Sequence, residues 1–279
     1  TTDRRLPKQL YLRNYPKISK NEALSLRVLL QLCHFYRLPV WLMTMRMIVN
    51  GRESEMKSNK NKGVLIFGLL YTILFVFDGI RVFDSPLPSS AGTYLVYTIM
   101  FVYGCFLFKS LLLPKWEEVR TSKRKFIFGV LKGWALLFIL TILFGLLSEM
   151  LRQMLGLSGQ GLNEANIQTA FKEQPLLIAV FACVIGPLVE ELFFRQILLR
   201  YLRKSLPTWL SVFLVGLAFA LTHMHSLSLS EWVGAVGYLG GGLAFSIIYV
   251  KEKENIYYPL LVHMLGNSLA LIILAIGSM

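Results

Sequence analysis

The sequence is organised around residues 186–195, which read Gly186-Pro187-Leu188-Val189-Glu190-Glu191-Leu192-Phe193-Phe194-Arg195. Apolar residues flank the charged part of this stretch, from Pro175 to Val189 and again from Ile197 to Leu199. Each charge inside a membrane-spanning helix raises the free energy of insertion by roughly 2.5–3.5 kcal/mol. Such groups are kept where they face the interior of a helix bundle, pair with one another and serve a function. We therefore expect the two carboxylates and the arginine to lie in a functional site inside a bundle.

The composition indicates a membrane protein. Hydrophobic residues make up 55% of the 279 residues, whereas soluble domains average about 45–50%. Several apolar runs reach about 20 residues, the length needed to cross a bilayer. These runs are continuous and do not alternate between apolar and polar residues, which argues against a transmembrane barrel. The sequence therefore predicts an all-α fold, that of a polytopic helical membrane protein.

Seven apolar runs are candidate transmembrane helices, and they cover residues 63–83, 94–113, 126–147, 174–202, 207–224, 232–250 and 257–276. The fourth run is longer than one span requires, and Gly186-Pro187 lies in its middle. Proline removes an intrahelical hydrogen bond and clashes with the preceding turn. We therefore expect about seven transmembrane helices with a kinked or broken fourth. A break there would place Glu190 and Glu191 in the first turn of the next helical piece, where the helix dipole stabilises negative charge.

The positive charge of the chain, formally +13, is concentrated between alternate apolar runs. The basic residues concerned are Lys57, Lys60, Lys62, Lys115, Arg120, Lys123, Arg124, Lys125, Arg200, Arg203, Lys204, Lys251 and Lys253. Cytoplasmic loops of membrane proteins carry such an excess of Lys and Arg. The pattern predicts an integral protein of a bacterial cell membrane, surrounded by lipids, with a cytoplasmic N-terminus and an outside C-terminus. It also explains the charge without nucleic acid as a partner.

Residues 1–55 differ from the rest of the chain. They are basic, and the apolar residues of 22–50 are interrupted by Arg27, Arg37 and Arg46, a pattern typical of interfacial amphipathic helices. We interpret residues 1–55 as a basic N-terminal segment and residues 56–279 as the membrane-embedded domain. The three cysteines, Cys33, Cys105 and Cys183, suggest neither a disulfide framework nor a CxxC metal site.

Helical spacing predicts different roles for the two glutamates. Glu191 and Arg195 are four residues apart and lie on one helical face, so that Arg195 can neutralise Glu191. Glu190 points about 100° away from Glu191 and is left to face a cavity, where a carboxylate can act as a general base toward water.

Two histidines and an asparagine in later apolar runs complete the candidate site. His263 and Asn267 are also four residues apart, and His223 ends the sequence Phe219-Ala220-Leu221-Thr222-His223. A neutral histidine and an asparagine amide can donate hydrogen bonds to a developing oxyanion. Each histidine alone could equally well bond across helices. The combination of these polar groups in three apolar runs favours one shared site.

The motifs resemble those of the type II CAAX prenyl endopeptidase family, which includes the Ras-converting enzyme and bacterial bacteriocin-processing and immunity-type membrane proteins. The resemblance covers residues 174–275 and rests on Glu190-Glu191-x-x-x-Arg195, Phe219-x-x-x-His223 and His263-x-x-x-Asn267 in this order. It implies that Glu190 and His223 activate the attacking water and that Glu191 and Arg195 hold this arrangement. It further implies that His263 and Asn267 form the oxyanion hole, and that no cofactor or metal takes part.

The leading hypothesis is therefore an intramembrane endopeptidase, a hydrolase that cleaves a peptide bond near the membrane-anchored end of a peptide or protein. By analogy with the family alone, leader peptides, peptide pheromones or other membrane proteins are the expected substrates in a bacterium, rather than prenylated proteins.

Three alternatives remain at this stage. Two carboxylates and two histidines could bind zinc, although the HExxH spacing is absent. A non-catalytic scaffold or immunity protein, which binds a sensor kinase or a toxin, could use the same fold. In a transporter, the buried charges would line an ion path, but the chain shows no inverted repeat to support that function.

Overall fold

The computed structural model describes residues 59–76, 91–158 and 161–277. All of them belong to one compact unit, Gly51–Met279. The predicted interfacial helices of residues 22–50, the predicted boundary after residue 55 and the end of the first predicted span, residues 77–83, lie outside the described residues.

The described residues form helices and connecting turns, with no strand among them. In chain order, with η marking π-helical segments, the elements are α2 (Asn59–Tyr71), η2 (Thr72–Val76), α3 (Ala91–Thr121), α4 (Lys123–Met154), α5 (Leu162–Glu173), α6 (Pro175–Val180), η4 (Phe181–Ile185), α7 (Gly186–Glu191), η5 (Leu192–Leu199), α8 (Arg200–Leu202), α9 (Thr208–Leu221), α10 (Leu229–Lys251) and α11 (Tyr257–Gly277). The predicted all-α polytopic membrane fold is confirmed.

Five of these helical stretches are long and apolar enough to cross a membrane, namely Ala91–Thr121, Lys123–Met154, Pro175–Leu202, Leu229–Lys251 and Tyr257–Gly277. Two shorter apolar helices, Lys62–Val76 and Thr208–Leu221, coincide with the first and fifth predicted runs. Among the described residues, the structure thus supports five spans of full length, and the predicted count of seven is not confirmed.

The fourth predicted run continues as one helical stretch through Gly186-Pro187, because its hydrogen bonding changes type instead of stopping. Two π-helical segments, η4 and η5, flank the six-residue helix α7. Pro187 lies just after η4, and in a membrane helix such a local π-helical adjustment compensates for the missing N–H of proline. A Cβ atom on Gly186 would lie 2.9 Å from the carbonyl oxygen of Phe181, so the π-helical turn before Pro187 requires glycine here. Such π-helical turns occur frequently at functional sites.

The prediction that Glu190 and Glu191 occupy the first turn of a new helix is therefore wrong. They are the last two residues of α7, and the helix runs on into η5 without a terminus. The positive end of a helix dipole is consequently not what stabilises these carboxylates. Their stabilisation has to come from neighbouring side chains.

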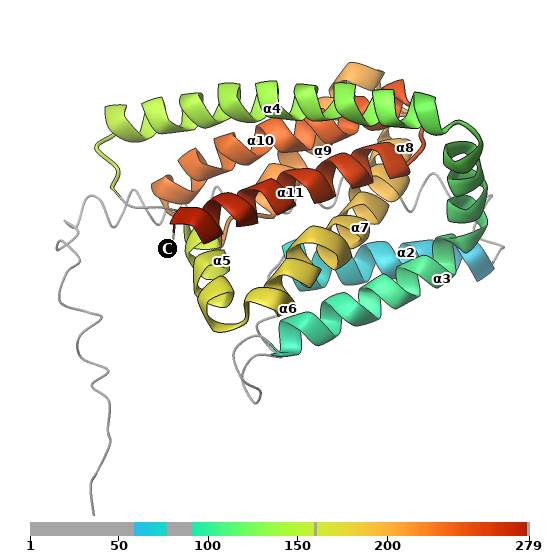
Figure 1. The fold of residues 1–279 in the computed structure, drawn as a ribbon, viewed down its shortest axis with the longest axis horizontal. Coiled ribbons are helices and arrows are strands. Elements are labelled where there is room, and N and C mark those ends of the chain that lie inside the picture. The colour runs from blue at the N-terminus through green and yellow to red at the C-terminus, as the bar shows by residue number, and fades with distance from the viewer. Residues whose placement is uncertain (1–58, 77–90, 159–160, 278–279) are drawn as a thin grey trace, which may run out of the picture. The chain divides into compact units, whose positions relative to one another are not determined.

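Helix α10 packs against both α4 and α9, and α11 packs against α4, η4 and α7. Figure 1 shows α4 lying alongside α10 and α11, with α2 and α3 on the other side of α7. The central stretch with the glutamates is thus covered by α11 on one side and by α2 and α3 on the other. This packing removes the charged residues from lipid.

Three of the basic segments meet at one end of the bundle. Glu254, in the turn between α10 and α11, forms ion pairs with Arg200 at 3.2 Å and with Arg203 at 2.5 Å. The neighbouring Asn255 donates a hydrogen bond to the carbonyl oxygen of Lys115 in α3. Loops that share one side of a membrane meet in this way, which agrees with the charge distribution along the sequence.

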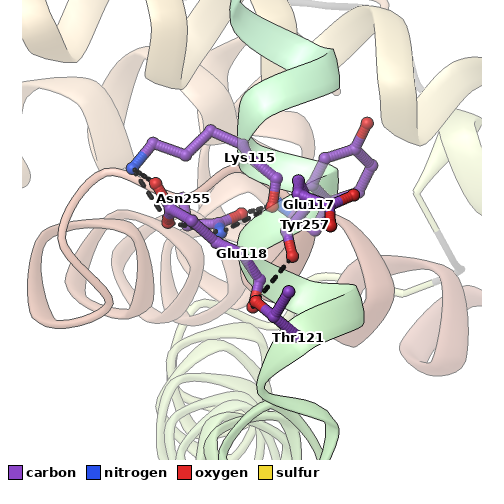
Figure 2. A network of polar contacts seen from close by, with 6 residues as sticks. All are labelled: Lys115, Glu117, Glu118, Thr121, Asn255 and Tyr257. Carbon is purple, nitrogen blue, oxygen red and sulfur yellow. Dashed lines mark hydrogen bonds and ion pairs between the residues drawn. The ribbon is translucent and has the colours of Figure 1, made fainter.

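Asn255 fixes the start of α11 against α3 (Figure 2). Its buried amide donates to the Lys115 carbonyl at 3.1 Å and to the Glu118 carboxylate at 3.2 Å, and its oxygen accepts from the backbone N–H of Tyr257 at 3.1 Å. The hydroxyl of Tyr257 donates to the carbonyl of Leu112 at 3.2 Å. These bonds set the position of α11, which carries two of the predicted site residues.

The helices α9 and α10 approach each other at two glycines. A Cβ atom on Gly242 would lie 2.6 Å from the carbonyl oxygen of Gly216 and 2.9 Å from its Cα. Because these atoms belong to the backbone, they cannot rotate away from an added methyl group. Close helix contact through small residues is typical of membrane bundles.

Replacing Gly242 with alanine is therefore expected to lower the free energy of unfolding by about 1–3 kcal/mol, through overpacking between α9 and α10. Gly237→Ala is the matched control in the same helix, because its added Cβ would meet only the Ser148 side chain, at 4.0 Å. Reversible unfolding in detergent micelles measures both variants. Equal stability of the two proteins would contradict this close backbone contact.

Candidate active site

A fully buried ion pair lies at the centre of the site. The Nε atom of Arg195 is 3.2 Å from Oε2 of Glu191, and both side chains are 0% exposed. A second nitrogen, Nη2, donates to the carbonyl of Gly242 in α10 at 3.2 Å. The guanidinium also lies 5.2–5.6 Å from the ring centroids of Phe194, Phe219 and Phe245. The predicted pairing of Glu191 with Arg195 is confirmed, and aromatic faces complete its enclosure.

His263 of α11 lies between the two glutamates. Its Nδ1 atom is 3.1 Å from Oε1 of Glu191, and its Nε2 atom is 3.7 Å from Oε2 of Glu190. Its ring stacks on Phe245, with centroids 4.3 Å apart. An ionised carboxylate only accepts hydrogen bonds, so a neutral His263 donates from Nδ1 to Glu191 and turns its Nε2 lone pair toward Glu190.

Glu190 is the less enclosed of the two acids. Its side chain is 15% exposed, yet its Oε2 atom is buried and has no hydrogen-bond donor among the described residues. Two tyrosines from the first part of the chain lie near Glu190. A Cβ atom on Gly186 would be 3.8 Å from both Oε1 of Glu190 and a ring carbon of Tyr97 in α3, and Tyr71 of α2 packs on Phe193 and Phe194, which follow the glutamates. A buried carboxylate oxygen without a donor is unfavourable for stability alone, and a catalytic role is one of the accepted explanations for it.

His223 lies in the turn that follows α9. Its Nδ1 atom is 2.9 Å from the carbonyl oxygen of Phe219. Because a carbonyl oxygen only accepts, Nδ1 carries the proton and Nε2 of the neutral ring carries a lone pair. The ring of Phe219 contacts both His223 and His263, with centroid distances of 4.8 Å and 5.8 Å.

Asn267 makes a different contact from the one expected of an oxyanion-hole residue. Its Nδ2 atom donates to the carbonyl of Ala182 in η4 at 2.7 Å. This bond ties α11 to the π-helical segment before the glutamates, and an amide nitrogen has a second N–H for another acceptor. The structure thus brings Glu190, Glu191, Arg195 and His263 into direct contact or close approach. His223 is linked to this group by the ring of Phe219, which contacts both histidines, and Asn267 is linked to it by its hydrogen bond to η4.

Sequence reasoning missed the tyrosines near the site. Tyr71 stacks on Phe193 with centroids 4.1 Å apart, and Tyr97 packs on Phe75 at 4.4 Å. Tyrosines in apolar runs are common, and no motif marks these two. Only the packing of α2 and α3 against the central stretch brings them near Glu190.

The donor set does not form a metal site. Within the part of the chain that the structure describes, no group of three or more His, Cys, Asp or Glu side chains is arranged to hold a metal ion. Arg195 already compensates the charge of Glu191, and a cation would compete with it.

Comparison with known proteins agrees with the resemblance drawn from the motifs. Residues 172–269 match a family model described as type II CAAX prenyl endopeptidase Rce1-like. All six predicted site residues lie in this segment. The chain is also similar to the membrane-embedded CAAX protease MroQ of Staphylococcus aureus (strain USA300), with 29% identity over 161 residues. That alignment covers 56% of this chain and 61% of the curated relative. No solved structure matches the chain at a comparable level of significance.

Proposed function

From the similarity of residues 172–269 to the Rce1-like endopeptidases, we propose that this integral membrane protein is an intramembrane glutamate endopeptidase. It would hydrolyse a peptide bond near the membrane-anchored end of a peptide or protein. The observation that carries the proposal is the Oε2 atom of Glu190, which is buried, lacks a donor among the described residues and lies 3.7 Å from Nε2 of His263.

In the proposed mechanism, the attacking water donates one hydrogen bond to Oε2 of Glu190 and the other to the Nε2 lone pair of His223. Glu190 takes the proton as the water oxygen bonds to the scissile carbonyl carbon, and the carbonyl π electrons move onto its oxygen. The buried pair of Glu191 and Arg195 holds Glu190 and His263 in place, since Glu191 binds both Arg195 and Nδ1 of His263.

The oxyanion is then stabilised by donors from α11. The proton accepted by Glu190 passes to Nε2 of His263, which donates a hydrogen bond to the oxyanion, while Asn267 uses its second N–H. As the carbonyl re-forms, the C–N bond breaks and the proton moves to the leaving nitrogen. The products are a carboxylic acid and an amine. The acid gives its proton to the amine and becomes a carboxylate, and Glu190 and His263 return to their initial states.

The substrate classes that suit this site are leader peptides, peptide pheromones and membrane proteins with an apolar anchor. The approach of such substrates through lipid agrees with a site inside the bundle. The proposed orientation places the basic end, with residues 115–125, 200–204 and 251–253, on the cytoplasmic side.

The proposal is tested with the purified chain in liposomes. The probe is a library of internally quenched peptides of about ten residues, each joined to an apolar helix, with a farnesylated peptide as a separate arm. Fluorescence gain and mass spectrometry of the products report cleavage. Cleavage by the wild type supports the proposal. If no peptide is cleaved and the Glu190→Ala protein retains full biological activity, a scaffold function replaces it.

Activity is expected to survive metal removal. Because the proposed base is a carboxylate and Arg195 already neutralises its neighbour, chelation with o-phenanthroline should change kcat by less than about twofold. The control is a zinc peptidase in the same liposomes, which should lose activity under these conditions. Stoichiometric zinc in the active protein, with activity lost on its removal, would contradict the metal-free mechanism.

A further inference from the structure

His223 is held on one face by an aromatic partner that the motif does not contain. Its imidazole stacks on the ring of Tyr238 in α10, with centroids 4.2 Å apart and planes inclined by 19°. Its edge is fixed separately, by the Nδ1 contact with the carbonyl of Phe219 at 2.9 Å. The hydrogen bond alone would let the ring pivot about it, whereas the stack restrains this rotation.

Tyr238 is in turn fixed by the start of α5. Its hydroxyl donates to Oε1 of Glu164 at 2.6 Å and accepts from Nδ2 of Asn163 at 2.6 Å. Both hydrogen-bonding roles of the hydroxyl are thus used, and the bond to a carboxylate is of the stronger, charge-assisted kind. Two adjacent residues of α5 therefore set the orientation of the tyrosine ring.

The same part of α5 also binds the turn that carries His223. The Oδ1 atom of Asn163 is 3.2 Å from Nε2 of His225. Glu231 accepts from the backbone N–H of His225 at 2.9 Å with one oxygen, and from that of Leu162 at 2.9 Å with the other. The α9–α10 turn and the first residues of α5 form one polar network.

We propose that Tyr238 is a positioning residue for His223, and that Glu164 and Asn163 hold it in place. The ring of Tyr238 keeps Nε2 of His223 directed at the water beside Glu190, without touching substrate. The inference rests on the proposed function. It adds that the site depends on residues 163 and 164, which precede the Rce1-like segment 172–269.

The test compares Tyr238→Phe, which keeps the stack and removes the hydroxyl, with Tyr238→Leu, which removes both. With the anchored peptide library described above, kcat is expected to fall about tenfold in the first variant and about 100-fold in the second, because small misplacements of a reacting group have effects of this size. KM should stay within about twofold, since substrate contacts are unchanged. The pH dependence of kcat should shift in both variants, since the surroundings of the titrating His223 ring change.

The control is Tyr249→Phe, which removes a tyrosine hydroxyl from a buried position near the C-terminal end of α10. Its kcat and pH profile should match those of the wild type. A double-mutant cycle of Tyr238→Phe with Glu164→Ala should be strongly non-additive, because both changes break the same hydrogen bond. Additive effects, or a wild-type kcat and pH profile in Tyr238→Phe, would overturn the inference.

A second measurement works without cleavage and separates this inference from the proposed function. The chain has four histidines, so ¹⁵N-histidine spectra can be assigned with His223→Gln. His223 should show the Nδ1-protonated tautomer in the wild type and a mixture of tautomers in Tyr238→Leu. An unchanged His223 signal would reject the positioning role even if no peptide is cleaved. Inactivity of the wild type on every probe would count against the proposed function alone.

Discussion

Replacing Glu190 with glutamine is expected to lower kcat by about 1,000-fold, with KM nearly unchanged. Glutamine keeps the size of the side chain but cannot take a proton from water, and general-base catalysis contributes typically 10²–10⁴-fold to rate. The buried Oε2 atom beside His263 is the group that would be lost. Cleavage of the anchored peptide library, measured at saturating substrate, gives kcat directly.

Glu149→Gln provides the matched control for this change. Glu149 is an exposed acid in α4 and accepts a hydrogen bond from Gln153 at 3.1 Å, away from the site. Its replacement should leave kcat unchanged. A Glu190→Gln protein that works within tenfold of the wild-type rate would remove this carboxylate from the chemistry.

Replacing Arg195 with methionine is expected to reduce the free energy of unfolding by about 3–5 kcal/mol, because Glu191 would remain buried without its counter-charge. The Gly242 carbonyl would lose a donor as well. Unfolding in detergent micelles, followed by helix content, measures the change. Removing both charges, in Glu191→Gln with Arg195→Met, should restore part of the lost stability, since no uncompensated charge remains.

The control for this prediction is an ion pair of the same type at the surface. The Nε atom of Arg120 lies 3.1 Å from Oε2 of Glu117, and the two side chains are 66% and 53% exposed, respectively. Arg120→Met should change stability by less than about 1 kcal/mol, because exposed pairs contribute little. Equal effects at Arg195 and Arg120 would show that the buried pair has no special part in the fold.

The fold class could be predicted from the sequence because it depends on local features. Runs of about 20 apolar residues and the alternation of basic loops can be recognised in short stretches of sequence. The thickness of the bilayer requires runs of this length, so they identify membrane-spanning helices. The pairing of Glu191 with Arg195 follows from helical spacing for the same reason.

Contacts between elements could not be predicted in this way. Helical spacing placed His263 beside Asn267, but His263 contacts Glu191 and Asn267 contacts the carbonyl of Ala182. The sequence Gly186-Pro187 indicated a kink or a break, and the structure has no break there, because the hydrogen bonding changes to π-helical type on both sides of α7. Tyr238 was missed because its contacts, a ring stack on His223 and two hydrogen bonds to α5, join elements that are distant in the sequence.

The two π-helical segments on either side of α7 have a consequence for the rotational phase of the central helix. In a regular α-helix each residue adds about 100° of rotation about the axis, so the direction of one side chain fixes the directions of all the others. Wider turns at Phe181–Ile185 and Leu192–Leu199 loosen this coupling at both ends of a six-residue piece. The direction in which Glu190 and Glu191 point around the helix axis can therefore change without rotating the lipid-facing side chains before and after them.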